Sequence, residues 1–172
     1  MAHLFIDPGF RAIGIAIYDV PKDNILDVGT LVLDKKVYDR DKKIHGSSKA
    51  DAHYVECAIK FLNDWSAQHL IEWVGFELPH GGMSFRAVKM LSIISGAVIG
   101  WAIAHELPIC YYTPGFNKKC ATGDTRATKE LVAMAVHRRW PLPMWSELDP
   151  KISEHIYDAA ALIIAAKTRG DI

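Results

Sequence analysis

Three short apolar runs within the first 33 residues most constrain how this chain folds. They cover His3–Ile6, Ile13–Tyr18 and Ile25–Leu33, and only short turns separate them. Short apolar runs bounded by turn residues are typical of buried strands, and strands joined by tight turns pair in antiparallel fashion. The sequence therefore predicts an antiparallel meander at the start of the chain.

The rest of the sequence alternates between helical and strand patterns. A polar segment, Asp34–Ala50, is predicted to be a loop, and Asp51 is a candidate N-cap for a helix that runs to Gln68. The other predicted elements are strands at Trp73–Phe76 and Ile109–Thr113, and helices at Ser84–Glu106, Asn117–Ala121, Thr125 or Thr128 to Trp140, and Ile152–Lys167. This order predicts an α/β fold in which helices flank a mixed five-stranded sheet.

Composition narrows the class of protein but not its function. The length of 172 residues suits a single domain spanning 1–172. Lys plus Arg and Asp plus Glu each number 20, so net charge does not indicate a partner. The three cysteines form no CxxC pair, which indicates a reducing, cytoplasmic environment without structural zinc. The apolar stretch Leu91–Ala104 falls short of the roughly 20 residues that cross a bilayer, so we expect no membrane contact.

Two carboxylates occupy matching positions at the ends of predicted strands. Asp7 ends the first strand and Glu77 ends the fourth, and a proline-containing turn follows each. If these strands are neighbours, both carboxylates emerge at one edge of the sheet, where Mg²⁺ would relieve their repulsion. An Asp before Pro-Gly is also an ordinary turn residue, so the interpretation depends on a third group.

The final predicted helix supplies that third group. His155 and Asp158 are separated by about 60° around the helix, and Glu154 and Asp158 by about 40°. His155 lies nearer the apolar face, so a site facing the sheet favours it over Glu154. Neutral imidazole can bind a metal or accept a proton, although a partly buried structural histidine would show the same pattern. We therefore predict a site for two Mg²⁺ or Mn²⁺ ions formed by Asp7, Glu77, His155 and Asp158.

Five segments in this order resemble the RuvC family of Holliday-junction resolvases, which have the RNase H-like fold. The first two are Phe5–Gly14, with its Asp-Pro-Gly, and Val74–Glu77. The helix at Leu91–Gly96, the Lys-rich segment Lys118–Lys129 and the terminal motif His155–Leu162 follow with compatible spacing. The resemblance implies a homodimeric, metal-dependent endonuclease that nicks four-way or branched DNA symmetrically and leaves 5′-phosphate and 3′-hydroxyl ends.

The resemblance also implies roles for basic residues. Lys118 and Lys129 would contact the DNA backbone or the scissile phosphate. With Lys119 and Arg126 they form a basic cluster near a helix start, where phosphate can bind. Family members carry an aromatic residue involved in junction opening where this sequence has His80. The small residues Ser95, Gly96 and Gly100 would permit close helix approach, either across a dimer or within the monomer.

Three other functions are compatible with parts of the pattern. A YqgF-like RNase H-like nuclease acting on RNA or on simpler DNA would use the same acids. A non-catalytic DNA-binding module would share the fold but would not need Asp7, Glu77 and Asp158. Actin-like and sugar-kinase ATPases carry a similar Asp-x-Gly, but they need two such domains, for which this chain is too short.

Overall fold

The five strands form one open sheet in the order β3-β2-β1-β4-β5. In this computed structural model, which describes residues 1–79, 84–149 and 153–172, β1 pairs with β2 and β2 with β3 in antiparallel register, whereas β1–β4 and β4–β5 are parallel. The strands are β1 (Ala2–Pro8), β2 (Ala12–Asp19), β3 (Asn24–Val32), β4 (Ile71–Glu77) and β5 (Ile109–Tyr112). The predicted meander and the predicted RNase H-like mixed sheet are therefore confirmed.

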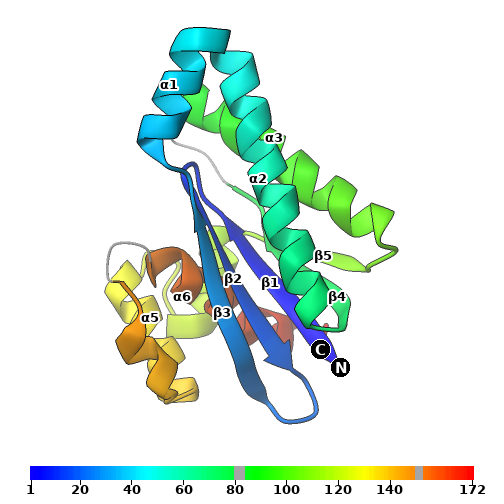
Figure 1. Cartoon of the computed structure of the whole chain (residues 1–172). Helices are drawn as coiled ribbons and strands as arrows, with labels where there is room; N and C mark the ends of the chain where they lie inside the picture. Colours follow the sequence, from blue (N-terminus) through cyan, green and yellow to red (C-terminus); the bar gives the residue numbers. More distant parts are fainter. Residues whose placement is uncertain (80–83, 150–152) are drawn as a thin grey trace.

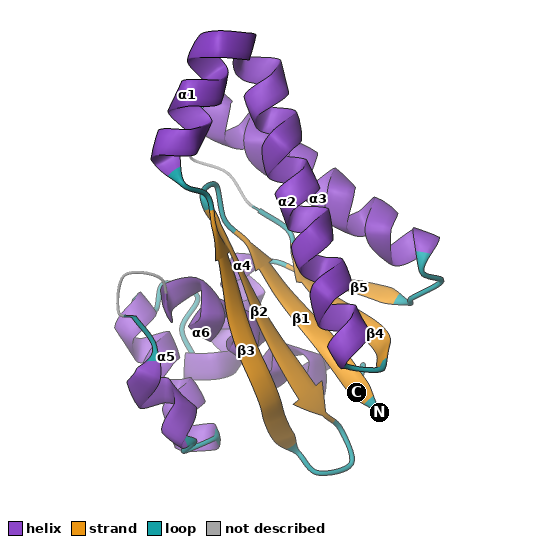
Figure 2. Cartoon of the chain, viewed as in Figure 1, coloured by secondary structure: helices purple, strands orange, loops and turns teal. Residues whose placement is uncertain are grey.

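Helices cover both faces of this sheet (Figures 1 and 2). One group, built mainly from α2 and α3, packs on the side of Leu4 and Ile6 of β1, and the other, dominated by α6, packs on the side of Phe5. The helices are α1 (Lys35–His45), α2 (Ser47–Gln68), α3 (Phe85–Ala104), α4 (Pro114–Thr122), α5 (Lys129–Arg139), the 3-10 turn η1 (Pro143–Glu147) and α6 (Ser153–Arg169).

The alternation of side chains along the strands determines which residues lie on each face of the sheet. Successive strand residues point to opposite faces, so Asp7 shares the α6 face with Phe5, and Glu77 shares it with Gly75. The α6 face is closed by an alanine-rich helix that includes the fully buried Ala160. Small side chains let α6 lie close to the sheet, and this closeness brings its polar residues to the strand ends.

The prediction of a loop at Asp34–Ala50 is wrong, because α1 occupies most of that segment. Its N-cap is Asp34, whose carboxylate accepts from the backbone N–H groups of Lys36 and Val37. Asp51 does not cap α2 as predicted, since α2 begins at Ser47 and Asp51 lies inside it. There the buried Asp51 carboxylate accepts from the Tyr38 hydroxyl and pairs with a lysine of α3, so it fastens α1 to the helical layer.

Helix α3 is longer than the apolar stretch recognised in the sequence. By length and composition alone, Phe85–Ala104 could cross a membrane. The core helix of a globular domain meets the same criterion, and Ile94 and Val98 of α3 are fully buried against the sheet. Its opposite side leaves Phe85 and Ile103 exposed, so part of the apolar surface of α3 has no partner among the described residues.

Candidate active site

The predicted carboxylates meet at one edge of the sheet. Strands β1 and β4 are parallel neighbours with Ile6 opposite Phe76, so Asp7 and Glu77 follow at the same level. Both strands end there and both carboxylates lie on the α6 face. Asp7 is only 6% exposed, and Glu77 is partly buried. The condition stated in the sequence analysis, that the two strands are neighbours, is therefore met.

Helix α6 delivers His155 and Asp158 to the same edge. The Nδ1 atom of His155 lies 2.7 Å from Oδ2 of Asp7, so the imidazole can donate a hydrogen bond to that carboxylate. Burial lowers the pKa of His155, but the hydrogen bond and the charge of Asp7 outweigh it and leave the pKa raised. The side chain of His155 is 19% exposed and that of Glu154 is 43% exposed, so His155 is the deeper of the two, as the helix geometry predicted.

These four side chains border a cleft of about 480 Å³. The cleft opens at the carboxyl ends of β1 and β4, beside the β1–β2 turn. Lys118 of α4 and Lys129 of α5 also line it, and Lys129 pairs with Glu154 at 2.7 Å. The lining therefore combines the three predicted carboxylates and the imidazole with two lysines, a composition that suits a bound phosphate between metal ions and cationic side chains.

The acids in the cleft repel one another. Burial raises the pKa of Glu77 to about 9, and the neighbouring charge of Asp7 adds to the effect. Burial likewise raises the pKa of Asp158 to about 7, again with a contribution from Asp7. Among the described residues, no three His, Cys, Asp or Glu side chains converge as a preformed set of metal ligands. Even so, Lys118 and Lys129 only partly offset the burial and mutual repulsion of these carboxylates, and oxygen-rich sites of this kind suit Mg²⁺ or Mn²⁺.

Asn117 is a site residue that the sequence reasoning did not identify. It is 2% exposed, and its amide donates to Oε2 of Glu77 at 2.9 Å and to the backbone oxygen of Asp158 at 3.2 Å. Its own Oδ1 is buried and has no hydrogen-bond partner among the described residues. The available signal was Thr113-Pro114, an N-cap followed by proline at the first helical position, which starts α4 three residues earlier than predicted.

The other predicted DNA contacts lie farther out. Lys119 and Arg126 are exposed and do not line the cleft. Gly123 adopts a left-handed conformation and ends α4, and the Asp124 carboxylate accepts a hydrogen bond from the backbone N–H of Arg126, which forms a tight turn between α4 and α5. Thr128, not Thr125, caps α5. His80 lies outside the described residues, as does Ile152 at the predicted start of the final helix.

Comparisons with known proteins point in the same direction. No protein-family model matches the chain. It is 25% identical over 136 residues to a crossover junction endodeoxyribonuclease RuvC of Paenarthrobacter aurescens, and 28% identical over 106 residues to that of Porphyromonas gingivalis. The matches cover 77% and 59% of this chain but 66% and 56% of the relatives, so the chain spans less than two thirds of their length.

Solved structures show a closer match in shape than in sequence. The chain superimposes on Thermus thermophilus RuvC in complex with a Holliday junction substrate with a TM-score of 0.71 at 18% identity, covering 99% of this chain and 94% of that one. A second Thermus thermophilus RuvC structure gives a TM-score of 0.69 at 19% identity, covering 99% and 96%. The RNase H-like fold and the resemblance to RuvC resolvases that the sequence predicted are confirmed.

Proposed function

We propose that this RuvC-like chain is a metal-dependent endodeoxyribonuclease that resolves four-way or branched DNA by symmetric nicking. The observation that carries the proposal is the meeting of Asp7, Glu77, His155 and Asp158 in one cleft of an RNase H-like sheet. The nuclease relatives and the RuvC fold support it. We further propose that the whole chain, residues 1–172, acts as one domain in the cytoplasm of a bacterium or of a phage-infected host.

Some residues of the cleft would bind the metal ions, and their mutual contacts orient the metal-binding side chains. We assign Asp7, Glu77, His155 and Asp158 to two Mg²⁺ or Mn²⁺ ions, a donor set that fits hard cations because oxygen atoms predominate. When bound, such ions supply positive charge to the attacking water and to the departing oxygen. Asn117 holds the Glu77 carboxylate, and Asp7 and His155 orient one another through their 2.7 Å contact.

The lysines of the cleft fit the phosphate. Lys118 and Lys129 line the same cavity as the acids. Lys129 is already paired with Glu154, so a phosphate must compete with that carboxylate or extend the network. Lys119 and Arg126 lie outside the cleft and suit contacts to the DNA backbone farther along. In this scheme, cleavage leaves a 5′-phosphate and a 3′-hydroxyl.

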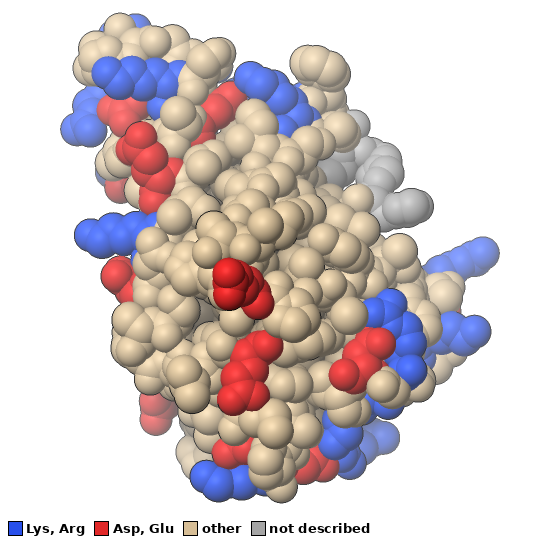
Figure 3. All heavy atoms as spheres, turned by 90° about the vertical axis from the view of Figure 1, so that its right-hand side faces the viewer, with Lys and Arg blue, Asp and Glu red and all other residues tan. Residues whose placement is uncertain are grey.

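A homodimer would place two such clefts on one junction. Along α3, Gly96 and Gly100 face open space, while Phe85 and Ile103 are 86% and 66% exposed. Ser95, by contrast, is buried within the monomer, so only part of the small-residue stripe is available to a partner. Figure 3, viewed from the right-hand side of Figure 1, shows a face made mostly of uncharged side chains, with Asp or Glu side chains near its centre and Lys or Arg side chains toward its margins. The exposed apolar residues of α3 support an interface.

The decisive experiment compares substrates and metals. The protein and its Asp7→Asn variant would be incubated with a labelled four-way junction and with matched linear duplex, RNA and hybrid, in Mg²⁺, Mn²⁺ or chelator. We expect paired nicks at symmetric positions on the junction, with either metal, and none from the variant. Equal cutting of linear substrates would replace the proposal with a broader nuclease. Full activity of Asp7→Asn would refute the assignment of the cleft.

A further inference from the structure

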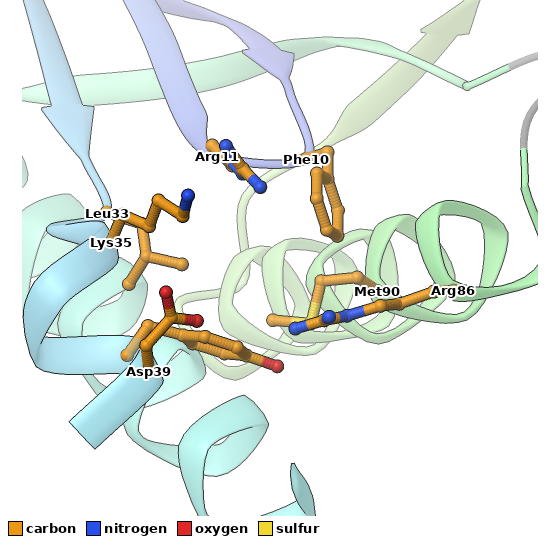
Figure 4. Close-up of a pocket in the computed structure, with 8 residues that line it drawn as sticks. Phe10, Arg11, Leu33, Lys35, Asp39, Arg86 and Met90 are labelled. Carbon is orange, nitrogen blue, oxygen red and sulfur yellow. The ribbon is translucent and has the colours of Figure 1, made fainter. Parts of the chain in front are cut away.

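A second cavity, of about 130 Å³, lies next to the acidic cleft. It is enclosed by the β1–β2 turn, the start of α1 and the first turns of α3 (Figure 4). The segment that forms one wall is α1, the helix that the sequence analysis mistook for a loop. Helix α1 is held in place by the hydrogen bond of Tyr38 to Asp51 of α2, so the wall is fixed to the core.

The described residues that line this cavity carry an excess of positive charge. Arg11, Lys35 and Arg86 enter it from three different elements, and Asp39 is the one acid among the described lining residues (Figure 4). In the part of the chain that the structure describes, none of the three cations forms an ion pair with a carboxylate. Three cations and one carboxylate favour an anionic ligand, and all three cations are exposed, so such a ligand can reach them from solvent.

Two of these cations, Arg11 and Arg86, lie against aromatic rings. The Arg11 guanidinium lies 5.5 Å from the centroid of the Phe10 ring, and the Arg86 guanidinium lies 5.3 Å from that of Tyr38. A simple phosphate site needs only N–H donors, whereas aromatic and guanidinium planes together are what stacks a nucleobase. The apolar side chain of Met90 completes the lining. This composition favours a ligand with both a flat ring and a phosphate.

The size of the cavity limits how much of such a ligand enters. Pockets that enclose a whole small-molecule ligand measure roughly 300–1,000 Å³, and this one is smaller. It therefore suits one ring system with its phosphate at the rim. The Asp39 carboxylate is placed to accept a hydrogen bond from an exocyclic amino group, as acidic side chains do with cytosine.

Two residues connect this cavity to the cleft. Phe10 and Arg11 line both, so a strand with its phosphate among Asp7 and Glu77 passes directly over them. A base can enter such a pocket only after it leaves the helical stack, and branched DNA offers unpaired or weakly stacked nucleotides at its crossing point.

We propose that this cavity binds one unpaired nucleobase of the DNA strand next to the phosphate in the acidic cleft. The base lies against Phe10 and Tyr38, and its backbone phosphate lies against Arg11, Lys35 and Arg86. This rests on the proposed function, because it takes the substrate to be branched DNA. It adds a recognition site for a nucleotide that the cutting chemistry itself does not require.

The test uses binding, so that no cleavage is needed. Junctions carrying a single 2-aminopurine at successive positions around the crossing, and a single-stranded oligonucleotide with one central 2-aminopurine, would be titrated with protein in chelator. The variants are Arg86→Met, which removes a cation, and Leu33→Trp, which fills the cavity from its apolar side without changing charge. Arg40→Met is the matched control, because Arg40 lies on α1 and pairs with Asp41 but does not line the cavity.

We expect one junction position whose fluorescence changes on binding of the unaltered protein and of Arg40→Met. That signal should disappear with both Leu33→Trp and Arg86→Met, and the affinity for the oligonucleotide should fall by roughly 10-fold, as for loss of one stacked base. If Arg86→Met weakens binding but Leu33→Trp leaves the fluorescence signal intact, the cavity holds a phosphate only and the proposal is overturned. No responsive position on a bound junction, or on the oligonucleotide, would also overturn it.

The oligonucleotide separates this proposal from the proposed function. If the protein does not bind the junction but binds the oligonucleotide with a signal that Leu33→Trp abolishes, the base pocket stands and junction resolution fails. If junctions are nicked symmetrically but neither variant changes any fluorescence signal, the nuclease stands and the base pocket fails. Circular dichroism of each variant would establish that Leu33→Trp is folded, and Asp39→Asn provides a second, less disruptive change that should alter which base gives the signal.

Discussion

Replacing Glu77 by Gln should stabilise the metal-free protein at alkaline pH while abolishing its activity. Burial and the charge of Asp7 raise the pKa of Glu77 from 4.5 to about 9. A group whose pKa is raised on folding binds its proton more tightly in the folded state, so stability falls as the pH rises from the unfolded value towards the folded one. Gln is nearly isosteric, and its carbonyl can still accept the hydrogen bond from Asn117.

The size of the effect follows from the pKa. Each pH unit between the two values costs about 1.4 kcal/mol, so Glu77 alone would lower the free energy of unfolding by about 4 kcal/mol between pH 5 and pH 8. For a domain of this length, 1 kcal/mol shifts Tm by roughly 2–4 °C, which gives a fall of roughly 8–16 °C. The raised pKa of Asp158 acts in the same direction in both proteins.

The assay is thermal unfolding in chelator at several pH values, for the unaltered protein and for Glu77→Gln. The difference between the two curves reports Glu77 together with its electrostatic interaction with Asp7 and Asp158. We expect the two Tm values to diverge above pH 5 and the variant to be the more stable protein at pH 8. Addition of Mn²⁺ at pH 8 should raise the Tm of the unaltered protein more than that of the variant, because bound cation stabilises the folded state.

Parallel curves would refute the reasoning. They would mean that the Glu77 carboxylate is as well stabilised in the folded chain as in the unfolded one, so that the cleft does not lack positive charge. A variant that is less stable at every pH would instead show that Glu77 contributes by packing or hydrogen bonding. In either case the electrostatic argument for a cation in the cleft would lose its basis.

Three further substitutions test other parts of the site. Asn117→Leu removes the amide that holds Glu77, and we expect a roughly 10- to 100-fold loss of metal affinity or activity. The measurement is the dependence of junction cleavage on Mn²⁺ concentration, and an unchanged dependence would show that Asn117 only fills space. Gly14→Ala would place a Cβ 2.1 Å from the backbone oxygen of His155. It should therefore lower the free energy of unfolding by about 1–3 kcal/mol, measured by urea denaturation. An unchanged midpoint would contradict the close approach of α6. Lys129→Gln should weaken junction binding in chelator and reduce the slope of log affinity against log salt by about one, a change that is absent if Lys129 contacts only Glu154.

The sequence predicts the sheet well because its constraints there are local. The turns at Pro8 and Asp23 are too short for anything but antiparallel neighbours, and a helical connection permits the strand that follows it to pair in parallel. The positions of Asp7 and Glu77 at one edge depend on the pairing of β1 with β4, which the structure supplies. Local turn chemistry was sufficient for the meander, whereas the neighbour relation of β1 and β4 was only a condition of the sequence prediction.

The elements that were missed depend on contacts between distant residues. Helix α1 has one buried residue, Tyr38, and its stabilising partner Asp51 belongs to the next helix. The segment is therefore strongly polar overall, and its composition resembles that of a loop. Asn117 is buried only because Glu77, 40 residues away in the chain, needs its amide. A polar residue buried by a long-range hydrogen bond has the same local pattern as an exposed one, which is why sequence periodicity does not reveal it.

Gly9 and Gly14 are required for steric reasons that are separate from the chemistry of the acids. A Cβ on Gly9 would lie 2.3 Å from Cε1 of His155, and one on Gly14 would lie 2.1 Å from the backbone oxygen of the same residue. Both contacts are far closer than atoms tolerate, so only glycine lets α6 come down onto β1 and β2 at this point. That approach is what allows His155 to reach Asp7 at 2.7 Å. The Asp-Pro-Gly turn and the glycine of the second strand therefore act together: the aspartate supplies the charge, and the two glycines supply the clearance that brings α6 to it.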